Sequence, residues 1–100
     1  MKTLSALTLT AAMLIMNPAF ASEDMAKKNG CAVCHDAKAK KMGPTWSAIA
    51  AKNKGVADAE AIVTAAITKG TKNKYGKIPM PPQPKAAADA PALAKWILAQ

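Results

Sequence analysis

The stretch Cys31-Ala32-Val33-Cys34-His35 decides the fold of this chain. A C-x-x-C-H run is the pattern through which a c-type haem is attached to a polypeptide. Two thiols add across the two vinyl groups of the haem, and the two intervening residues let one helical turn present both sulfurs to the same porphyrin edge. The next residue, His35, then lies under the iron and can bind it through an imidazole nitrogen. The motif therefore predicts one covalently attached haem c.

Three other uses of the motif compete with haem attachment: a thioredoxin-like redox pair, half of a zinc site, and a structural disulfide. The chain contains two cysteines and one histidine, so a zinc site would have to take further ligands from carboxylates. A thioredoxin-like pair needs a βαβ pattern around the motif, and the sequence shows no alternation typical of strands. These arguments favour haem over the first two alternatives.

Length and composition also favour a protein that folds around a cofactor. A chain of 100 residues allows one domain at most. Apolar residues make up 51% of it, but many of them are alanines, and aromatic residues are only 4%. Domains this small are marginally stable and usually need a covalent link or a bound group. We therefore expect the haem-free polypeptide to be poorly folded.

The N-terminus has the pattern of a secretory signal. Lys2 gives a positive start, Leu4–Met16 is an apolar stretch, and Ala19-Phe20-Ala21 fits an A-x-A cleavage site. The apolar stretch is short for a membrane span, which needs about 20 residues, although an uncleaved anchor is the alternative. We expect 1–21 to be a cleaved signal peptide and 22–100 to form a cytochrome domain in the periplasm.

Capping residues and apolar spacing predict short helices separated by loops, with no alternation typical of strands. Besides a helical turn at the motif, helices are expected over 23–29 with Ser22 as its cap, from Thr45 to about Asn53, from Asp58 to about Lys69, and from about Pro91 to Ala99. The last helix should pack across the first. The inner faces form the core and the walls of the haem site, and their expected members are Trp46, Ile49, Ala50, Ile62, Val63, Ala66, Ile67, Leu93, Trp96 and Ile97.

Met80 stands in the proline-rich run Ile78-Pro79-Met80-Pro81-Pro82. Prolines stiffen the backbone and disfavour helix or a central strand. A rigid loop suits a thioether ligand, because a neutral sulfur binds iron weakly and must be held in place. Of the alternatives, Met42 follows His35 too closely to reach the opposite haem face, and Met25 lies on a helix beside the motif. The sequence favours Met80 as the second iron ligand.

Taken together, these motifs resemble those of the small bacterial class I cytochromes c of the c-551 (c8) group. The C-x-x-C-H motif, Gly43-Pro44, the Met80 run and Leu93-Ala94-Lys95-Trp96 occur in the same order and spacing, and the likeness covers 22–100. The resemblance implies an all-α fold of four to five short helices wrapped around one covalently bound, low-spin haem, with Cys31 and Cys34 as thioether attachments and His35 and Met80 as axial ligands.

The resemblance also implies roles for residues around the haem. The carbonyl of Pro44 would accept a hydrogen bond from Nδ1–H of His35 and so orient the ring. This chain has no arginine, whereas the family commonly places an arginine and a tryptophan near a haem propionate. Ala66 falls where the arginine would be, and Tyr75 replaces the tryptophan but can still donate one hydrogen bond. Gln83 stands where the family often has an asparagine that bonds the methionine sulfur.

The implied function is that of a soluble periplasmic electron carrier in respiration, including denitrification, rather than an enzyme. With His35 and Met80 both bound, no iron position stays open to oxygen or peroxide. The alternative is a haem peroxidase or small-ligand sensor that works through loss of Met80.

Charge indicates the partners. The net charge of +8 comes with 14 lysines, and lysines are dense around the attachment motif and before Met80. They favour acidic redox proteins as partners. By resemblance these are a cytochrome bc1-type donor and a terminal oxidase or nitrite reductase as acceptor. We expect a monomer with no nucleic-acid partner and no stable membrane insertion.

Overall fold

The protein is described here from a computed structural model, which describes residues 18–100. This part of the chain is all-α, as predicted, and its only β pairing is an isolated antiparallel bridge between Thr71 and Met80. The elements in chain order are α1 (Pro18–Lys28), a 3-10 turn (Cys31–Val33), α2 (Trp46–Lys52), α3 (Ala59–Lys69), a second 3-10 turn (Pro84–Ala86) and α4 (Ala90–Leu98).

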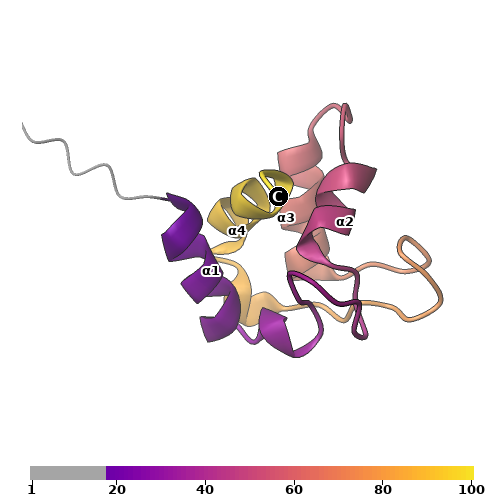
Figure 1. Cartoon of the computed structure of the whole chain (residues 1–100), viewed down its shortest axis with the longest axis horizontal. Coiled ribbons are helices and arrows are strands. Elements are labelled where there is room, and N and C mark those ends of the chain that lie inside the picture. Colours follow the sequence, from indigo (N-terminus) through magenta and orange to yellow (C-terminus); the bar gives the residue numbers. More distant parts are fainter. Residues whose placement is uncertain (1–17) are drawn as a thin grey trace, which may run out of the picture.

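Helix α4 is the element against which the other helices pack. It contacts α1, α2 and α3, and Figure 1 shows it in yellow between α1 on one side and α2 and α3 on the other. The three apolar residues expected on its inner face are buried: Leu93, Trp96 and Ile97 have exposed fractions of 1%, 8% and 4%. The expected contact between the last helix and the first is confirmed.

Helix α1 begins earlier than the sequence predicted. It starts at Pro18 and runs without a break to Lys28, so Ser22 lies inside the helix rather than at its cap. The expectation assumed a chain that begins at Ser22, whereas the alanine-rich residues before it favour helix and extend the first turn. The rest of the predicted signal peptide, residues 1–17, lies outside the described residues, and its cleavage remains a prediction.

Helices α2 and α3 have the predicted positions but differ in how they begin. Thr45 caps α2 as expected, because its hydroxyl accepts a hydrogen bond from the backbone N–H of Ala48 at 3.2 Å. Asp58 precedes α3 in the left-handed region (φ 58°), and its side chain makes no capping hydrogen bond. On α3, Val63 and Ile67 are buried, but Ile62 is 37% exposed and is not part of the inner face.

The core contains few large side chains. Its buried apolar members are Ala26, Trp46, Ile49, Val63, Ile67, Ala86, Ala90, Leu93, Ala94, Trp96 and Ile97. Among the described residues, Leu93 is the only one with a large side chain that is less than 2% exposed. The segment after Gly70 forms a wide irregular loop, drawn in orange in Figure 1, that extends away from this core.

Candidate functional site

The two motif cysteines lie on one tight turn. The 3-10 turn begins at Cys31, and the backbone N–H groups of Cys34 and His35 both donate to the Cys31 carbonyl, at 3.2 and 3.0 Å. Both cysteines are free thiols of intermediate burial, and burial raises the pKa of the Cys31 thiol. The turn therefore holds two thiols close in sequence and space, which confirms the helical turn predicted for the motif.

His35 is buried, with 8% of its surface exposed, and its ring is oriented by one hydrogen bond. Nδ1 lies 2.7 Å from the carbonyl oxygen of Pro44, the contact that the family resemblance implied. Because a carbonyl only accepts, Nδ1 must carry the hydrogen, and in a neutral imidazole this leaves Nε2 unprotonated. Among residues 18–100 no hydrogen bond reaches Nε2. His35 thus presents a nitrogen lone pair suited to a metal ion.

Two neighbours restrict the His35 ring from other directions. A side chain at Gly43 would collide with it, because a Cβ built there lies 2.5 Å from Cε1 and 2.8 Å from Nδ1 of His35. The ring of Trp46 stacks on His35 with centroids 4.8 Å apart and planes at 29°. Trp46 in turn meets Trp96 of α4 edge to face, with centroids 5.2 Å apart. The imidazole is therefore fixed to the core, and the importance of Gly43 for this packing was not evident from the sequence.

Met80 lies at a fixed point of the irregular loop. Thr71 and Met80 exchange two backbone hydrogen bonds of 3.0 Å each, and the N–H of Gln83 donates to the Ile67 carbonyl at 2.9 Å. Gly70 (φ 77°) lies so close to the Met80 carbonyl that a Cβ there would overlap with it. The backbone of this loop is thus hydrogen-bonded to Thr71 and to the end of α3, whereas the rigidity expected from its prolines and the role of Met80 as an iron ligand remain predictions.

Gln83, the residue in place of the family's asparagine, points elsewhere. Its Nε2 donates to the carbonyl of Pro81 at 3.1 Å. In this arrangement the amide hydrogen bonds within its own loop.

Tyr75 has a partner that the sequence did not reveal. The buried Asn53 donates from Nδ2 to the Tyr75 hydroxyl at 3.1 Å. The ammonium groups of Lys52 and Lys74 lie 5.0 and 5.7 Å from the centre of the Tyr75 ring. The only sequence signal was an asparagine at the expected end of a helix, which by itself predicts a cap and no more.

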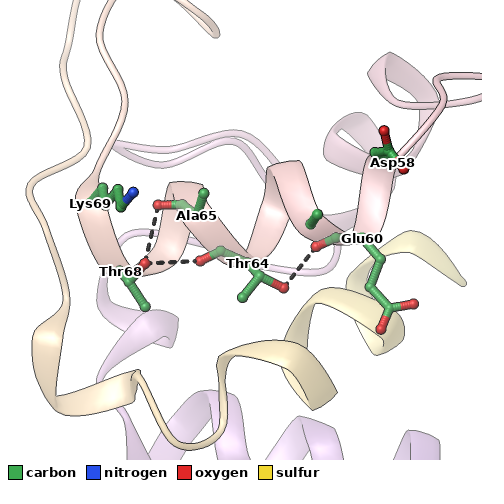
Figure 2. A pocket seen from close by; sticks show the side chains of 7 residues that line it. Asp58, Glu60, Thr64, Ala65, Thr68 and Lys69 are labelled. Atoms are coloured by element: carbon green, nitrogen blue, oxygen red, sulfur yellow. Dashed lines mark hydrogen bonds between the residues drawn. The ribbon is translucent and has the colours of Figure 1, made fainter.

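A recess elsewhere on the surface does not contain these residues. It has a volume of about 580 Å³ on the outer face of α3 and is lined by Asp58, Glu60, Ala61, Thr64, Ala65, Thr68 and Lys69 (Figure 2). Figure 2 shows that its two threonine hydroxyls are engaged by carbonyls of the same helix. The recess lies along a single helix and contains none of the motif residues, so the residues around His35 remain the candidate site.

Two further observations concern metal ligands and membrane spans. Within residues 18–100, no three or more His, Cys, Asp and Glu side chains come together in a way that could hold a metal ion. No helix in the same range is long and apolar enough to cross a membrane.

Comparison with known proteins identifies the family. The family model described as cytochrome c matches residues 22–100. The chain is 47% identical to cytochrome c-552 of Hydrogenobacter thermophilus over 79 residues, covering 79% of this chain and 81% of that protein. It is 41% identical to cytochrome c-551 of Pseudomonas aeruginosa over 78 residues, covering 78% and 75% of the two chains. The chain belongs to the cytochrome c family.

The solved structures agree with this assignment. The fold of this cytochrome c matches the crystal structure of cytochrome c552 from Nitrosomonas europaea with a TM-score of 0.74 at 44% identity, covering 77% of this chain and 96% of that one. The class 1 cytochrome MtoD from Sideroxydans lithotrophicus matches with a TM-score of 0.64 at 30% identity, covering 80% and 92%. The predicted membership of the c-551 type of small class I cytochromes c is confirmed.

As a cytochrome c, the protein is an electron-transfer protein with one covalently bound haem c. Its own residues fit that cofactor. Thioether attachment uses two cysteines, and this chain has two, both free and on one turn. The unprotonated Nε2 of the buried His35 is a suitable iron donor, because its other nitrogen is already engaged by Pro44.

Proposed function

We propose that this cytochrome c is a periplasmic carrier of single electrons, with its haem attached through Cys31 and Cys34 and its iron bound by His35 and Met80. The observation that carries the proposal is the hydrogen bond from His35 to the Pro44 carbonyl, since it leaves Nε2 as the lone-pair donor. When bound, the haem supplies the ferric/ferrous couple. No residue is required to transfer a proton.

The residues of the site serve to keep one geometry in both oxidation states. Pro44 and Trp46 fix the plane of the His35 ring, so the imidazole does not reorient when the charge of the site changes. The paired backbone of Thr71 and Met80 holds the loop that carries the thioether. A weak ligand such as methionine gains from this preorganisation, because little entropy remains to be lost when it binds. Methionine ligation also favours a higher potential than harder ligands give.

The surface beside the motif fits an acidic partner. Three apolar side chains are largely exposed, Val33 at 73%, Met42 at 62% and Ile78 at 61%. Exposed lysines accompany them in sequence at Lys38, Lys40, Lys41, Lys72 and Lys77. Exposed apolar side chains with exposed lysines close in sequence suit brief encounters with acidic redox proteins. We propose a cytochrome bc1-type donor and a terminal oxidase or nitrite reductase acceptor, as the family resemblance implies.

The test uses the purified periplasmic product. Its intact mass should exceed that of the polypeptide 22–100 by one haem, and its visible spectrum should change on reduction. Met80→Ala should remove the weak long-wavelength absorption that marks sulfur–iron bonding in the ferric protein. Met42→Ala, at an exposed methionine, is the matched control and should retain it. A colourless product of bare polypeptide mass would refute the proposal. Absence of the sulfur–iron absorption from the unsubstituted protein would favour the peroxidase or sensor alternative.

A further inference from the structure

The side chain of Asn29 joins the end of α1 to the start of α4. Its Nδ2 donates to the Met25 carbonyl at 2.8 Å and to Oδ2 of Asp89, the residue before α4, at 3.0 Å. A carbonyl only accepts, so the amide atom that faces Met25 must be the nitrogen, and the orientation of the amide is assigned. An ionised Asp89 also only accepts. The position between these two groups therefore requires a side chain with N–H hydrogens.

The residue after Asn29 makes this amide chemically reactive. Gly30 ends α1 with a φ of 75°, a conformation that favours glycine, and its lack of a Cβ lets its nitrogen approach the Asn29 side chain. In such a pair the glycine nitrogen loses its proton and attacks Cγ of the asparagine, ammonia leaves, and a succinimide ring forms. Water then opens the ring to aspartate or isoaspartate, with no oxidant or reductant involved. Of the asparagines in this chain, Asn29 alone is followed by glycine.

The fold restrains both reacting groups. The Gly30 N–H donates to the Lys27 carbonyl at 3.1 Å, whereas ring closure needs this nitrogen free and deprotonated. The amide of Asn29 is held by its bonds to Met25 and Asp89. Gly30 is exposed, so water and hydroxide reach it once these hydrogen bonds break. The reaction therefore requires local opening of the junction between α1 and α4.

We propose that Asn29 is a site of spontaneous deamidation, protected by the hydrogen bonds between α1 and α4, and that its product weakens the same junction. A carboxylate at position 29 has no hydrogen to donate, and it faces the carbonyl of Met25 and the carboxylate of Asp89. It also lies at the C-terminal end of α1, where the helix dipole disfavours negative charge. Deamidation thus converts a transient opening into a permanent loss of contact. This inference does not depend on the proposed function.

The junction is directly connected to the turn that carries the two thiols. The Gly30 carbonyl accepts from the N–H of Val33 at 3.3 Å, and Cys31 follows Gly30 in the chain. Isoaspartate adds one carbon to the backbone at position 29, so it changes the spacing between α1 and Cys31. The deamidated chain therefore has a weaker junction in either form, and in the isoaspartate form it also has a displaced turn.

The first test compares the holoprotein at neutral pH in buffer and in guanidinium chloride, with deamidation measured by ion-exchange chromatography and peptide mass mapping. In guanidinium chloride Asn29 should react ahead of Asn53 and Asn73, each of which is followed by lysine. Folding should slow the reaction at least about tenfold, the factor that one hydrogen bond to a charged group gives. Asn29→Gln should stay unreacted, because its longer side chain closes a ring far more slowly. Equal rates in the two solvents, or no preference for Asn29, would overturn the inference.

The second test concerns the product. Asn29→Asp reproduces it, and Asn29→Leu is the matched control, with a similar shape and no polar side-chain atoms. The melting temperature of the Asn29→Asp holoprotein should lie at least about 4 °C below that of the unsubstituted protein, and below that of Asn29→Leu. Adding Asp89→Asn to Asn29→Asp should recover part of the loss, because a donor again faces an acceptor.

Two results of this second test would count against the inference. If Asn29→Asp melts together with Asn29→Leu, or if Asp89→Asn recovers nothing, the product does not act through Asp89 and the inference is overturned. Should Asn29→Asp fail to accumulate, unsubstituted protein deamidated in guanidinium chloride and then refolded takes its place in the melts. The same lowered melting temperature is expected of it, and an unchanged one refutes the weakening of the junction.

Discussion

Replacing Gly43 by alanine should displace His35. An added Cβ lies 2.5 Å from His35 Cε1, 2.8 Å from Nδ1 and 3.1 Å from the Cys34 carbonyl oxygen, whereas ordinary contacts begin at 3.4 Å. The ring and the backbone must separate by about 1 Å to relieve the closest contact. Trp46 stacks on the ring, so the ring has little room to retreat. A shift of that size is enough to break the 2.7 Å hydrogen bond from Nδ1 to Pro44.

The magnitude follows from these contacts. Overpacking a well-filled site costs about 1–3 kcal/mol, and loss of the hydrogen bond to Pro44 adds about 1 kcal/mol. The free energy of unfolding should fall by about 2–4 kcal/mol. In a domain of this size each kcal/mol lowers the melting temperature by about 4–8 °C. The melting temperature of the Gly43→Ala holoprotein should therefore fall by at least about 8 °C.

The assay combines a thermal melt followed by circular dichroism with NMR of the reduced protein, in which the His35 ring protons should shift. Gly55→Ala is the control: its φ is 73° and an added Cβ meets nothing within 4 Å. It should cost about 1–2 kcal/mol from backbone strain alone and leave the His35 signals in place. The reasoning is refuted if Gly43→Ala is as stable as the unsubstituted protein, or if it leaves the His35 ring protons where they were.

Other predictions follow from the loop, the surface charge and the core. Gly70→Ala should displace the Met80 backbone and weaken the sulfur–iron absorption of the ferric protein, because its Cβ would overlap with the Met80 carbonyl; an unchanged spectrum would contradict this. The N–H groups of Lys38 and Ala39 hold the pKa of the exposed Asp36 below its usual value. Its contribution to stability is therefore complete above about pH 4 and lost as pH falls through the lowered pKa. Melts at pH 7 and pH 2.5 should show a smaller acid-induced loss for Asp36→Asn than for the unsubstituted protein, and equal losses would exclude the effect. Electron-transfer rates with an acidic partner should fall steeply as salt rises past about 0.1 M, where the Debye length is about 10 Å, and a flat dependence would remove the electrostatic argument. Haem-free polypeptide should lack a cooperative melt by circular dichroism, and a native-like transition would show that the core suffices alone.

The features that the sequence predicted well depend on local chemistry. The Thr45 cap requires only a hydroxyl and the N–H three residues later, and the turn of the motif requires only its own backbone. The buried face formed by Leu93, Trp96 and Ile97 can also be read from neighbouring residues, because a helical repeat of 3.6 residues places all three side chains on one side of the helix. Features of this kind leave a signature within a few residues, and the structure contains them where they were expected.

The features that were missed depend on distant partners. Ile62 shares the apolar spacing of α3 with Val63 and Ile67, but the width of a buried face is set by the neighbouring helix and not by the periodicity. The contact between Asn53 and Tyr75 joins residues 22 positions apart, and nothing in either neighbourhood indicates it. Asp58 has a residue type typical of a cap, but its positive φ prevents the usual capping geometry, in which the backbone is extended.

The core and the functional site of this protein share the same side chains. Trp46 stacks on His35 with one face and meets Trp96 in the core, so a displacement of the imidazole is also a displacement of the core. The remaining buried apolar residues of the described part of the chain are four alanines and five aliphatic side chains, too little apolar volume for a domain of this size to be stable by burial alone. Haem attachment therefore does two things at once in this chain. At the proposed site it would place the redox group and add apolar surface near the aromatic residues that pack on His35, so substitutions near His35 should change stability and spectrum together.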